Sequence, residues 1–122
     1  MIFFSKKILV VDDASENFLL LEMFLQDTGI ELTYSDNGLQ ALQLSQDKQF
    51  DLILMDIQMS GMNGYEATTG IRQRGITIPI IALTSHSSQE VHDKCYLVGC
   101  NAVLMKPVSK TILIQTLQLY LG

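Results

Sequence analysis

The stretch that decides the fold is Asp51-Leu52-Ile53-Leu54-Met55-Asp56-Ile57-Gln58-Met59-Ser60-Gly61-Met62-Asn63-Gly64. Four apolar residues lead into Asp56, and the two glycines and the asparagine that follow are typical of a turn. A short apolar segment closed by turn-forming residues predicts a strand that is buried on both faces. Strands of this kind belong to parallel sheets covered by helices, whose ligands bind beyond the carboxyl ends of the strands. Asp56 is therefore predicted to lie at the edge of the sheet where a ligand would bind.

The composition predicts one folded domain over residues 1–122, with residues 1–5 as an N-terminal extension. Hydrophobic residues make up 48% of the chain and charged residues 17%, which argues against disorder. The net charge of −5 makes the chain a poor electrostatic match to nucleic acid. No apolar segment is long enough to span a membrane, and Cys95 and Cys100 have the spacing of neither a disulfide framework nor a metal site. We therefore expect a soluble, cytoplasmic domain that contacts neither nucleic acid nor membrane, with both cysteines buried as small apolar residues.

Strand and helix patterns alternate along the chain. Apolar segments predict strands at residues 8–11, 31–35, 51–55, 78–83 and 101–105, of which 31–35 is the most polar and so the nearest to an edge. Helical spacing and capping residues predict helices that begin with a cap at Asp13 or Ser15, at the Asp36-Asn37-Gly38 turn, near Gly64, at a capping box in Ser87-Ser88-Gln89-Glu90, and at Ser109. Five such units predict an α/β fold, a doubly wound five-stranded parallel sheet with helices on both faces.

Five polar residues come at or just after the ends of four predicted strands: Asp12, Asp13, Asp56, Thr84 and Lys106. The carboxyl ends of the strands meet at one edge of such a sheet, so we expect these side chains to lie together. Each of them alone has a commoner structural role, as a helix cap, a turn former or a surface lysine. Together, three carboxylates repel one another unless a cation neutralises them, and oxygen ligands with room for water suit Mg²⁺.

This set of residues suits phosphoryl transfer to Asp56. A carboxylate beside Mg²⁺ can attack a phosphorus atom and form an aspartyl phosphate. Lys106 would neutralise a developing phosphoryl oxygen, and the Thr84 hydroxyl would donate a hydrogen bond to another.

The sequence resembles the receiver domains of two-component response regulators, and is most similar to those attached to hybrid sensor histidine kinases. The resemblance extends from Ile8 to Leu121 and depends on the order and spacing of these segments: Val10-Val11-Asp12-Asp13 with Asn17, Asn37-Gly38 with Ala41-Leu42, Asp51 to Met59, Met62 to Thr68, Pro79 to Thr84, Lys94-Cys95 with Gly99, and Lys106-Pro107.

The resemblance implies a flavodoxin-like (βα)5 fold with sheet order 2-1-3-4-5 and Asp56 as the phosphoacceptor. It implies Mg²⁺ bound by Asp13, Asp56 and the backbone carbonyl of Gln58, with Asp12 acting through water. Thr84 and Lys106 would contact the phosphoryl group, and Lys106-Pro107 would be a cis peptide.

The resemblance also implies a partner, which is a histidine kinase or a histidine phosphotransfer domain. This partner would dock on the first helix and the loops around Asp56 and supply the phosphoryl group from a phosphohistidine. The domain would assist its own phosphorylation and dephosphorylation, as a stand-alone regulator or as a piece of a hybrid histidine kinase. We expect a monomer or a weak dimer through the fourth and fifth helices.

Three positions depart from the family pattern. Ser60 replaces the usual proline after Met59, and Ser85 is bulkier than the common alanine. Val103 replaces an aromatic residue whose movement is coupled to Thr84, and an aliphatic side chain has no ring to swing. We therefore expect phosphorylation to persist while the structural response on the face of the fourth helix, fifth strand and fifth helix is muted.

Alternatives from other classes follow from the same residues. A degenerate receiver would act as a phosphorylation-independent interaction module, and Val103 and Ser60 keep this alternative open. A Mg²⁺-dependent phosphatase that forms an aspartyl phosphate usually has a second acid where this chain has Gln58. A flavin-binding protein would have a glycine- and hydroxyl-rich loop after the first strand, where this chain has two acids. His86 and His92 lack a third ligand at metal-site spacing, and we expect both to be exposed.

Overall fold

Strands and helices alternate along residues 5–122, the part of the chain that this computed structural model describes. The strands are β1 (Lys7–Val11), β2 (Glu31–Ser35), β3 (Leu52–Asp56), β4 (Ile80–Thr84) and β5 (Ala102–Met105). The helices are α1 (Ser15–Leu25), α2 (Gly38–Asp47), α3 (Gly64–Gln73), α4 (Gln89–Val98) and α5 (Lys110–Leu121). Of the predicted N-terminal extension, only Ser5 lies within the described residues. None of the described helices is long and apolar enough to cross a membrane.

The five strands form one parallel sheet in the order β2-β1-β3-β4-β5. This confirms the predicted α/β class, the doubly wound topology and the order that the resemblance implied. β2, the most polar strand, lies at an edge as predicted. The chain runs outward from β1 to β2 and then in the other direction through β3 to β5. The switch point therefore lies between β1 and β3, where ligands bind in folds of this type.

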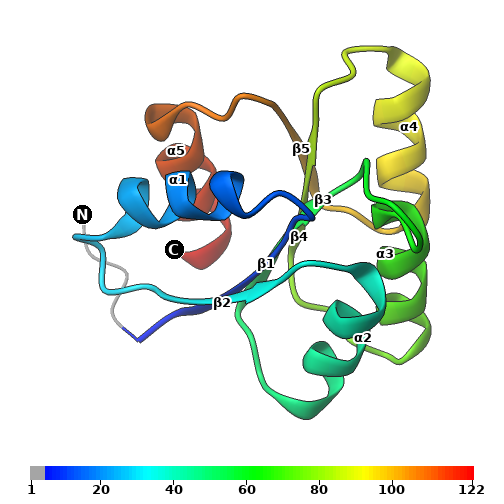
Figure 1. Cartoon of the computed structure of the whole chain (residues 1–122), viewed down its shortest axis with the longest axis horizontal. Coiled ribbons are helices and arrows are strands. Elements are labelled where there is room, and N and C mark those ends of the chain that lie inside the picture. Colours follow the sequence, from blue (N-terminus) through cyan, green and yellow to red (C-terminus); the bar gives the residue numbers. More distant parts are fainter. Residues whose placement is uncertain (1–4) are drawn as a thin grey trace.

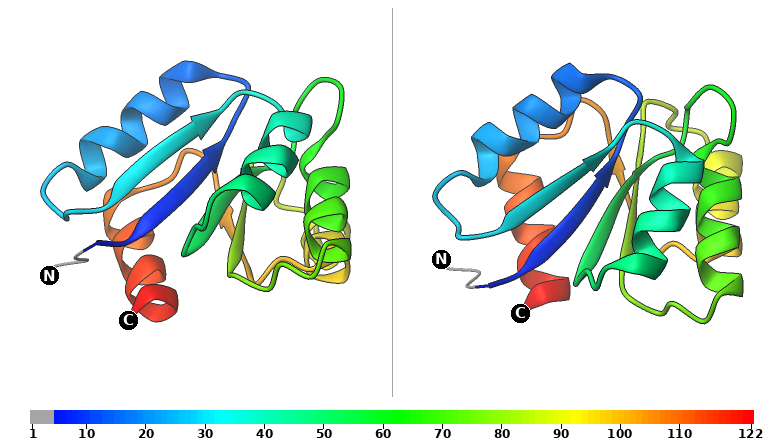
Figure 2. Two further views of the ribbon diagram at one scale, coloured as in Figure 1. Left: turned by 90° about the horizontal axis from the view of Figure 1, so that it is seen from below. Right: turned by 60° about the horizontal axis from the view of Figure 1, so that its bottom comes forward.

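Helices cover both faces of the sheet, with α1 and α5 on one side and α2, α3 and α4 on the other (Figure 1). Figure 2 shows the same layers in two further orientations. Side chains of β1 alternate between the two interfaces: Ile8 and Val10 pack in the cluster under α1 and α5, whereas Leu9 and Val11 pack in the cluster under the other three helices. Strands β3 and β4 are buried along their whole length, which is why their sequences are continuously apolar instead of alternating.

Several helix ends agree with the predictions because the capping residues form the expected hydrogen bonds. Asn37 caps α2 by accepting from the Gln40 amide at 2.8 Å, and Ser109 caps α5 in the same way. Asn63 begins α3 with a complete capping box. Gly99 ends α4 in a left-handed conformation, at φ 117°, as its place after Val98 predicted.

Two predicted caps are wrong. The N-cap of α1 is Ala14, which forms no side-chain capping bond, and neither Asp13 nor Ser15 has that role. The Asp13 carboxylate instead accepts the Ser60 amide at 3.3 Å, and Ser15 is already the first residue of the helix. The N-cap of α4 is Ser88 instead of Ser87. A capping box would need a glutamate or glutamine three positions after Ser88, where the chain has Val91.

Strand bounds also differ from the predictions by one or two residues. Pro79 precedes β4 instead of starting it, while Asp56 and Thr84 are the last residues of β3 and β4 instead of following them. This difference matters because the ladder then holds the backbone of both polar residues. The pairing places Asp56 opposite Leu83 and Thr84 opposite Met105.

A half-buried arginine joins the segments at the amino-terminal end of β4. Arg72, in the last turn of α3, donates to the carbonyls of Ile76, Ile78 and Gly99 and to the side chain of Asn101, at 2.8–3.1 Å. A Cβ atom added to Gly99 would lie 2.8 Å from the Arg72 side chain, so the guanidinium needs this glycine. Arg72 therefore connects α3, the loop before β4, the end of α4 and the start of β5.

We predict that Arg72→Ala lowers the free energy of unfolding by about 2–4 kcal/mol, because partly buried carbonyls lose their donors. Arg74→Ala is the matched control, since Arg74 is exposed and donates to the Gly70 carbonyl of its own helix. We expect that control to change stability by about 0.5 kcal/mol or less. Urea unfolding followed by circular dichroism measures both, and equal effects of the two variants would contradict the prediction.

Candidate functional site

The carboxyl ends of four strands bring the predicted site residues together. Asp12 and Asp13 follow β1, Asp56 ends β3, Thr84 ends β4 and Lys106 follows β5. The Lys106 ammonium lies 2.9 Å from Oδ1 of Asp56 and 3.2 Å from Oδ2 of Asp12. Lys106 thus contacts both Asp56 and Asp12, although Asp12 lies 94 positions away in sequence.

Asp56 is almost fully buried, with 1% of its surface exposed. Burial raises the pKa of this carboxyl to about 6, against the opposing effect of the hydrogen bond from Lys106. The backbone amide of Gln58 donates to Oδ1 of Asp56 at 3.3 Å. The start of α3 lies close against the end of β3, because a Cβ atom on Gly64 would collide with the backbone carbonyl of Asp56. Asp56 is therefore a carboxylate shielded from water at the end of the central strand.

Asp12 is also buried, and its polar atoms are all engaged. Its carboxylate accepts hydrogen bonds from the Ala14 amide at 2.9 Å and from the Asn17 side chain at 3.1–3.2 Å, besides its ion pair with Lys106. Burial acts to lower the pKa of Lys106, but its contacts with Asp56 and Asp12 outweigh this effect and raise it. Lys106 is therefore held as a cation between two buried carboxylates.

Asp12, Asp13 and Asp56 can each offer a carboxylate oxygen, and these atoms all lie within 4.8 Å of one another. Asp13 is exposed, and its carboxylate accepts the Ser60 amide at 3.3 Å. Three carboxylates thus face one ammonium group, which leaves an excess of negative charge in a small volume. A hard divalent cation with oxygen ligands, such as Mg²⁺, fits this donor set. The Gln58 carbonyl as a further ligand stays a prediction.

Gln58 and Thr84 are joined by their side chains, which sequence reasoning missed. The side-chain amide of Gln58 donates to the Thr84 hydroxyl at 2.9 Å. That hydroxyl also accepts a hydrogen bond from the backbone amide of His86 at 3.1 Å. Thr84 is fully buried whereas Gln58 is exposed. The exposed Gln58 side chain therefore covers the buried Thr84 hydroxyl, whose contact with a phosphoryl group stays a prediction.

Asn17 and Tyr34 are further residues of the site to which sequence reasoning assigned no role. The Asn17 amide bonds the Asp12 carboxylate, and the Tyr34 hydroxyl donates to the Asp12 carbonyl at 2.7 Å. The only signal for Asn17 was its place in the family pattern, and nothing in the sequence indicated Tyr34.

Other predicted features have mixed outcomes. Cys95 and Cys100 are buried as expected, and burial raises the pKa of both thiols. Lys106-Pro107 is a cis peptide, as the resemblance implied. His86 is exposed, but the expectation that His92 is exposed is wrong: it is half-buried on α4, and its Nε2 has no hydrogen-bond partner among the described residues.

Comparison with known proteins agrees with this geometry. The family described as "Response regulator receiver domain" matches residues 8–118. Sensor histidine kinase GacS of Pseudomonas protegens is 37% identical over 121 residues, which cover 95% of this chain and 13% of GacS. The chain therefore spans only about an eighth of the length of this curated relative.

Two solved receiver domains have the same fold. The receiver domain of sensor histidine kinase PA1611 from Pseudomonas aeruginosa, which has a magnesium ion coordinated in its active-site cleft, is 34% identical with a TM-score of 0.87, over 96% of this chain and 98% of that one. The receiver domain of Ssk1 from Saccharomyces cerevisiae, crystallised with the histidine phosphotransfer protein Ypd1, is 30% identical with a TM-score of 0.91, over 98% and 91%. From the family match, these likenesses and the acidic cluster at the switch point, we conclude that this chain belongs to the response regulator receiver domain family of two-component signalling.

Proposed function

We propose that this domain accepts a phosphoryl group from a phosphohistidine onto Asp56, with Mg²⁺ held by Asp12, Asp13, Asp56 and the backbone carbonyl of Gln58. The observation that carries this proposal is the position of Asp56. It is a buried carboxylate 2.9 Å from the Lys106 ammonium and within 4.8 Å of two further carboxylates, at the switch point of a doubly wound sheet.

The chemistry needs Asp56 as a carboxylate. One oxygen of Asp56 forms a bond to phosphorus while the bond between phosphorus and the imidazole nitrogen breaks, and the electron pair of that bond stays on the imidazole. The Lys106 ammonium, already beside Oδ1, is placed to pair with a phosphoryl oxygen. The Thr84 hydroxyl, which donates to Oε1 of Gln58 at 3.2 Å, can donate to a second phosphoryl oxygen once it turns away from Gln58. Mg²⁺, when bound, offsets the charge of the carboxylates and of the incoming phosphoryl group.

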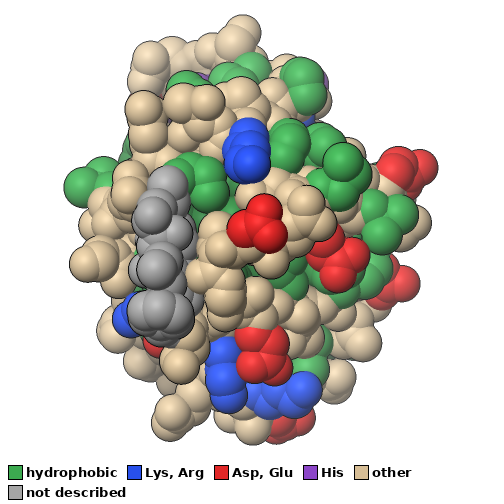
Figure 3. All heavy atoms as spheres, turned by 90° about the vertical axis from the view of Figure 1, so that its left-hand side faces the viewer, with side chains coloured by type: hydrophobic (Ala, Val, Ile, Leu, Met, Phe, Trp, Pro, Cys, Tyr) green, Lys and Arg blue, Asp and Glu red, His purple; other side chains and the backbone are tan. Residues whose placement is uncertain are grey.

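The partner in this proposal is a histidine kinase or a histidine phosphotransfer domain, and the Ssk1–Ypd1 complex supports the second kind by likeness. Helix α1 follows the acidic residues of β1 directly and exposes Leu19 and Met23 to solvent. Figure 3 shows the face on the left-hand side of Figure 1, toward which the carboxyl-terminal end of α1 runs, with hydrophobic and acidic side chains intermixed. We place docking on α1 and the loops around Asp56, and we place this domain in the cytoplasm as a monomer or a weak dimer.

A degenerate receiver that only binds partners is the alternative. The site does not favour it, because the three carboxylates converge, Lys106 pairs with two of them, and Thr84 is present at the end of the neighbouring strand. Val103 is half-buried opposite Ala82 and packs against the core cluster, so it fills part of the space of an aromatic side chain without supplying a ring.

Phosphorylation is tested by intact mass after incubation with acetyl phosphate, with and without Mg²⁺. We predict a Mg²⁺-dependent gain of one phosphoryl group in the wild type and none in Asp56→Asn. Asp93→Asn, which changes an exposed aspartate of α4, is the matched control and should be phosphorylated normally. If the wild type gains no mass from acetyl phosphate or from a phosphorylated histidine phosphotransfer domain, the proposed function is wrong.

Mg²⁺ affinity should depend on pH. With the pKa of Asp56 at about 6 in the metal-free protein, a proton competes with the cation below that pH, so we predict about tenfold weaker binding at pH 5 than at pH 7. Because burial raises the pKa of Asp56 above the ordinary value of 3.8 for an aspartate, the metal-free protein should gain stability as pH falls through about 6. Isothermal titration with Mg²⁺ measures the affinity, and equal dissociation constants at the two pH values would contradict the prediction.

A chemical-shift map with and without beryllofluoride tests the expected effect of Val103. We predict large changes around Asp56 and Thr84 and small ones on α4, β5 and α5, since Val103 has no ring whose movement could follow Thr84. Val103→Tyr should enlarge the response on that face. Large shifts there in the wild type would show that the switch operates without an aromatic residue.

A further inference from the structure

Tyr34 makes a contact with the acidic site that the chemistry described above does not use. It lies near the end of the edge strand β2, opposite Val10 in the ladder with β1. Its hydroxyl donates to the backbone carbonyl of Asp12 at 2.7 Å. This is a short hydrogen bond between side chain and backbone, and it joins two positions 22 residues apart.

The carbonyl that Tyr34 holds belongs to the peptide group between Asp12 and Asp13. On the other side of Asp12, its amide donates to the Ser35 carbonyl at 3.0 Å, and its carboxylate is bound by Ala14, Asn17 and Lys106. A planar peptide group whose oxygen is fixed has its orientation fixed as well. The Tyr34 hydroxyl therefore sets the direction in which the chain leaves Asp12 and enters Asp13.

Asp13 depends on its backbone for its position. It is exposed, and its carboxylate has one hydrogen bond within residues 5–122, a 3.3 Å contact with the Ser60 amide. Asp12 and Asp56, in contrast, are buried and paired with Lys106. Of the three carboxylates that converge, Asp13 is thus the one whose placement is least supported by its own side-chain contacts.

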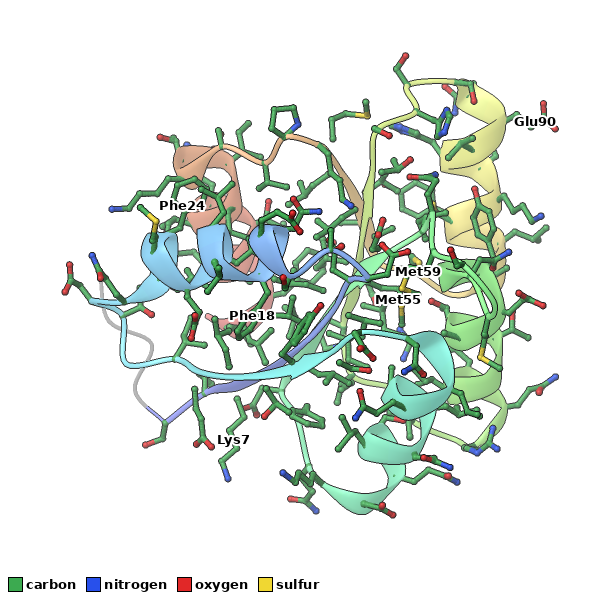
Figure 4. The ribbon with its side chains drawn as sticks, viewed as in Figure 1. Lys7, Phe18, Phe24, Met55, Met59 and Glu90 are labelled. Atoms are coloured by element: carbon green, nitrogen blue, oxygen red, sulfur yellow. The ribbon has the colours of Figure 1, made fainter. Side chains whose placement is uncertain are left out.

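The ring of Tyr34 is itself held in place. It stacks on Phe18 of α1, with ring centroids 4.7 Å apart and planes at 28°. Phe18 points from α1 toward β2 in Figure 4. Burial and the nearby carboxylates of Asp36, Asp12 and Asp13 raise the pKa of the Tyr34 phenol, so it stays protonated and can donate. A rigid ring that carries a donor is suited to fixing a backbone group.

We propose that Tyr34 is a positioning residue of the cation site, whose hydroxyl orients the Asp12–Asp13 peptide and so prepares the Asp13 carboxylate to bind Mg²⁺. This inference rests on the proposed function, because it assumes that the acidic cluster binds the cation. Groups that orient metal ligands without touching the metal commonly change affinity by tenfold or more. A site with this support loses less conformational freedom when the cation binds.

The test is Mg²⁺ affinity of Tyr34→Phe, measured by isothermal titration at pH 7. This variant keeps the ring and its stack on Phe18 and removes only the hydroxyl. Tyr120→Phe is the matched control, because Tyr120 donates to the backbone carbonyl of Asn101 at 3.0 Å, away from the site. We expect Tyr34→Phe to bind Mg²⁺ about tenfold more weakly, and Tyr120→Phe to bind it as the wild type does.

A second readout uses the metal-free protein. In ¹⁵N-labelled samples, Tyr34→Phe should shift and broaden the amide resonance of Asp13, which shares the peptide group with the Asp12 carbonyl, and Tyr120→Phe should leave it unchanged. Thermal melts of the two variants show whether their stability is equally affected.

The outcomes separate this inference from the proposed function. A wild type that binds Mg²⁺, with a Tyr34→Phe variant of equal affinity and an unchanged Asp13 resonance, would overturn the role of Tyr34 and leave the proposed function intact. A wild type that binds no Mg²⁺ would overturn both. A lowered melting temperature in Tyr34→Phe without loss of Mg²⁺ affinity would show that the bond only stabilises the fold.

Discussion

The repulsion between three carboxylates at one edge of the sheet is the constraint on which the site depends. Asp12 and Asp56 are buried, so their charges are poorly screened, and the Lys106 ammonium between them is the one cationic side chain that the structure records in an ion pair with either. One positive charge cannot balance Asp13 as well. The remaining negative charge is what makes a divalent cation, and then a phosphoryl group with its own cation, a good fit for this edge.

The rest of the fold keeps these charged groups in place. Strands β3 and β4, which are buried along their whole length, end at the same edge of the sheet in Asp56 and Thr84. The ladder holds the backbone of both residues. On the far side from the site, Arg72 connects α3 to the loop before β4 and to the end of α4 through backbone carbonyls, and to the start of β5 through the Asn101 side chain. One end of the sheet is thus stabilised by hydrogen bonds within the protein, while the other retains charge that is only partly paired and remains available for a ligand.

Much of the site could be predicted because its residues lie at or just after the carboxyl ends of the strands. Asp12, Asp56, Thr84 and Lys106 were predicted to meet because the direction of a parallel sheet follows from alternating strand and helix patterns. The caps of α1 and α4 were predicted wrongly, since several adjacent polar residues can each cap a helix and local spacing does not choose among them. At α1 the Asp13 carboxylate bonds the Ser60 amide, 47 positions away, instead of capping the helix. The half-burial of His92 was missed for a similar reason, because it depends on how α4 lies against its neighbours.

The sequence by itself determined the α/β class, the five strands, the family and the identity of the acidic, hydroxyl and ammonium groups, because hydrophobic burial and chain direction are recorded in local patterns. The tertiary structure alone decided which side chains support those groups. The bond of Gln58 to Thr84 and that of Tyr34 to Asp12 join side chains to positions more than 20 residues away. Such contacts arise from strand register and helix packing, which place donor and acceptor within 3 Å of each other only after the chain has folded.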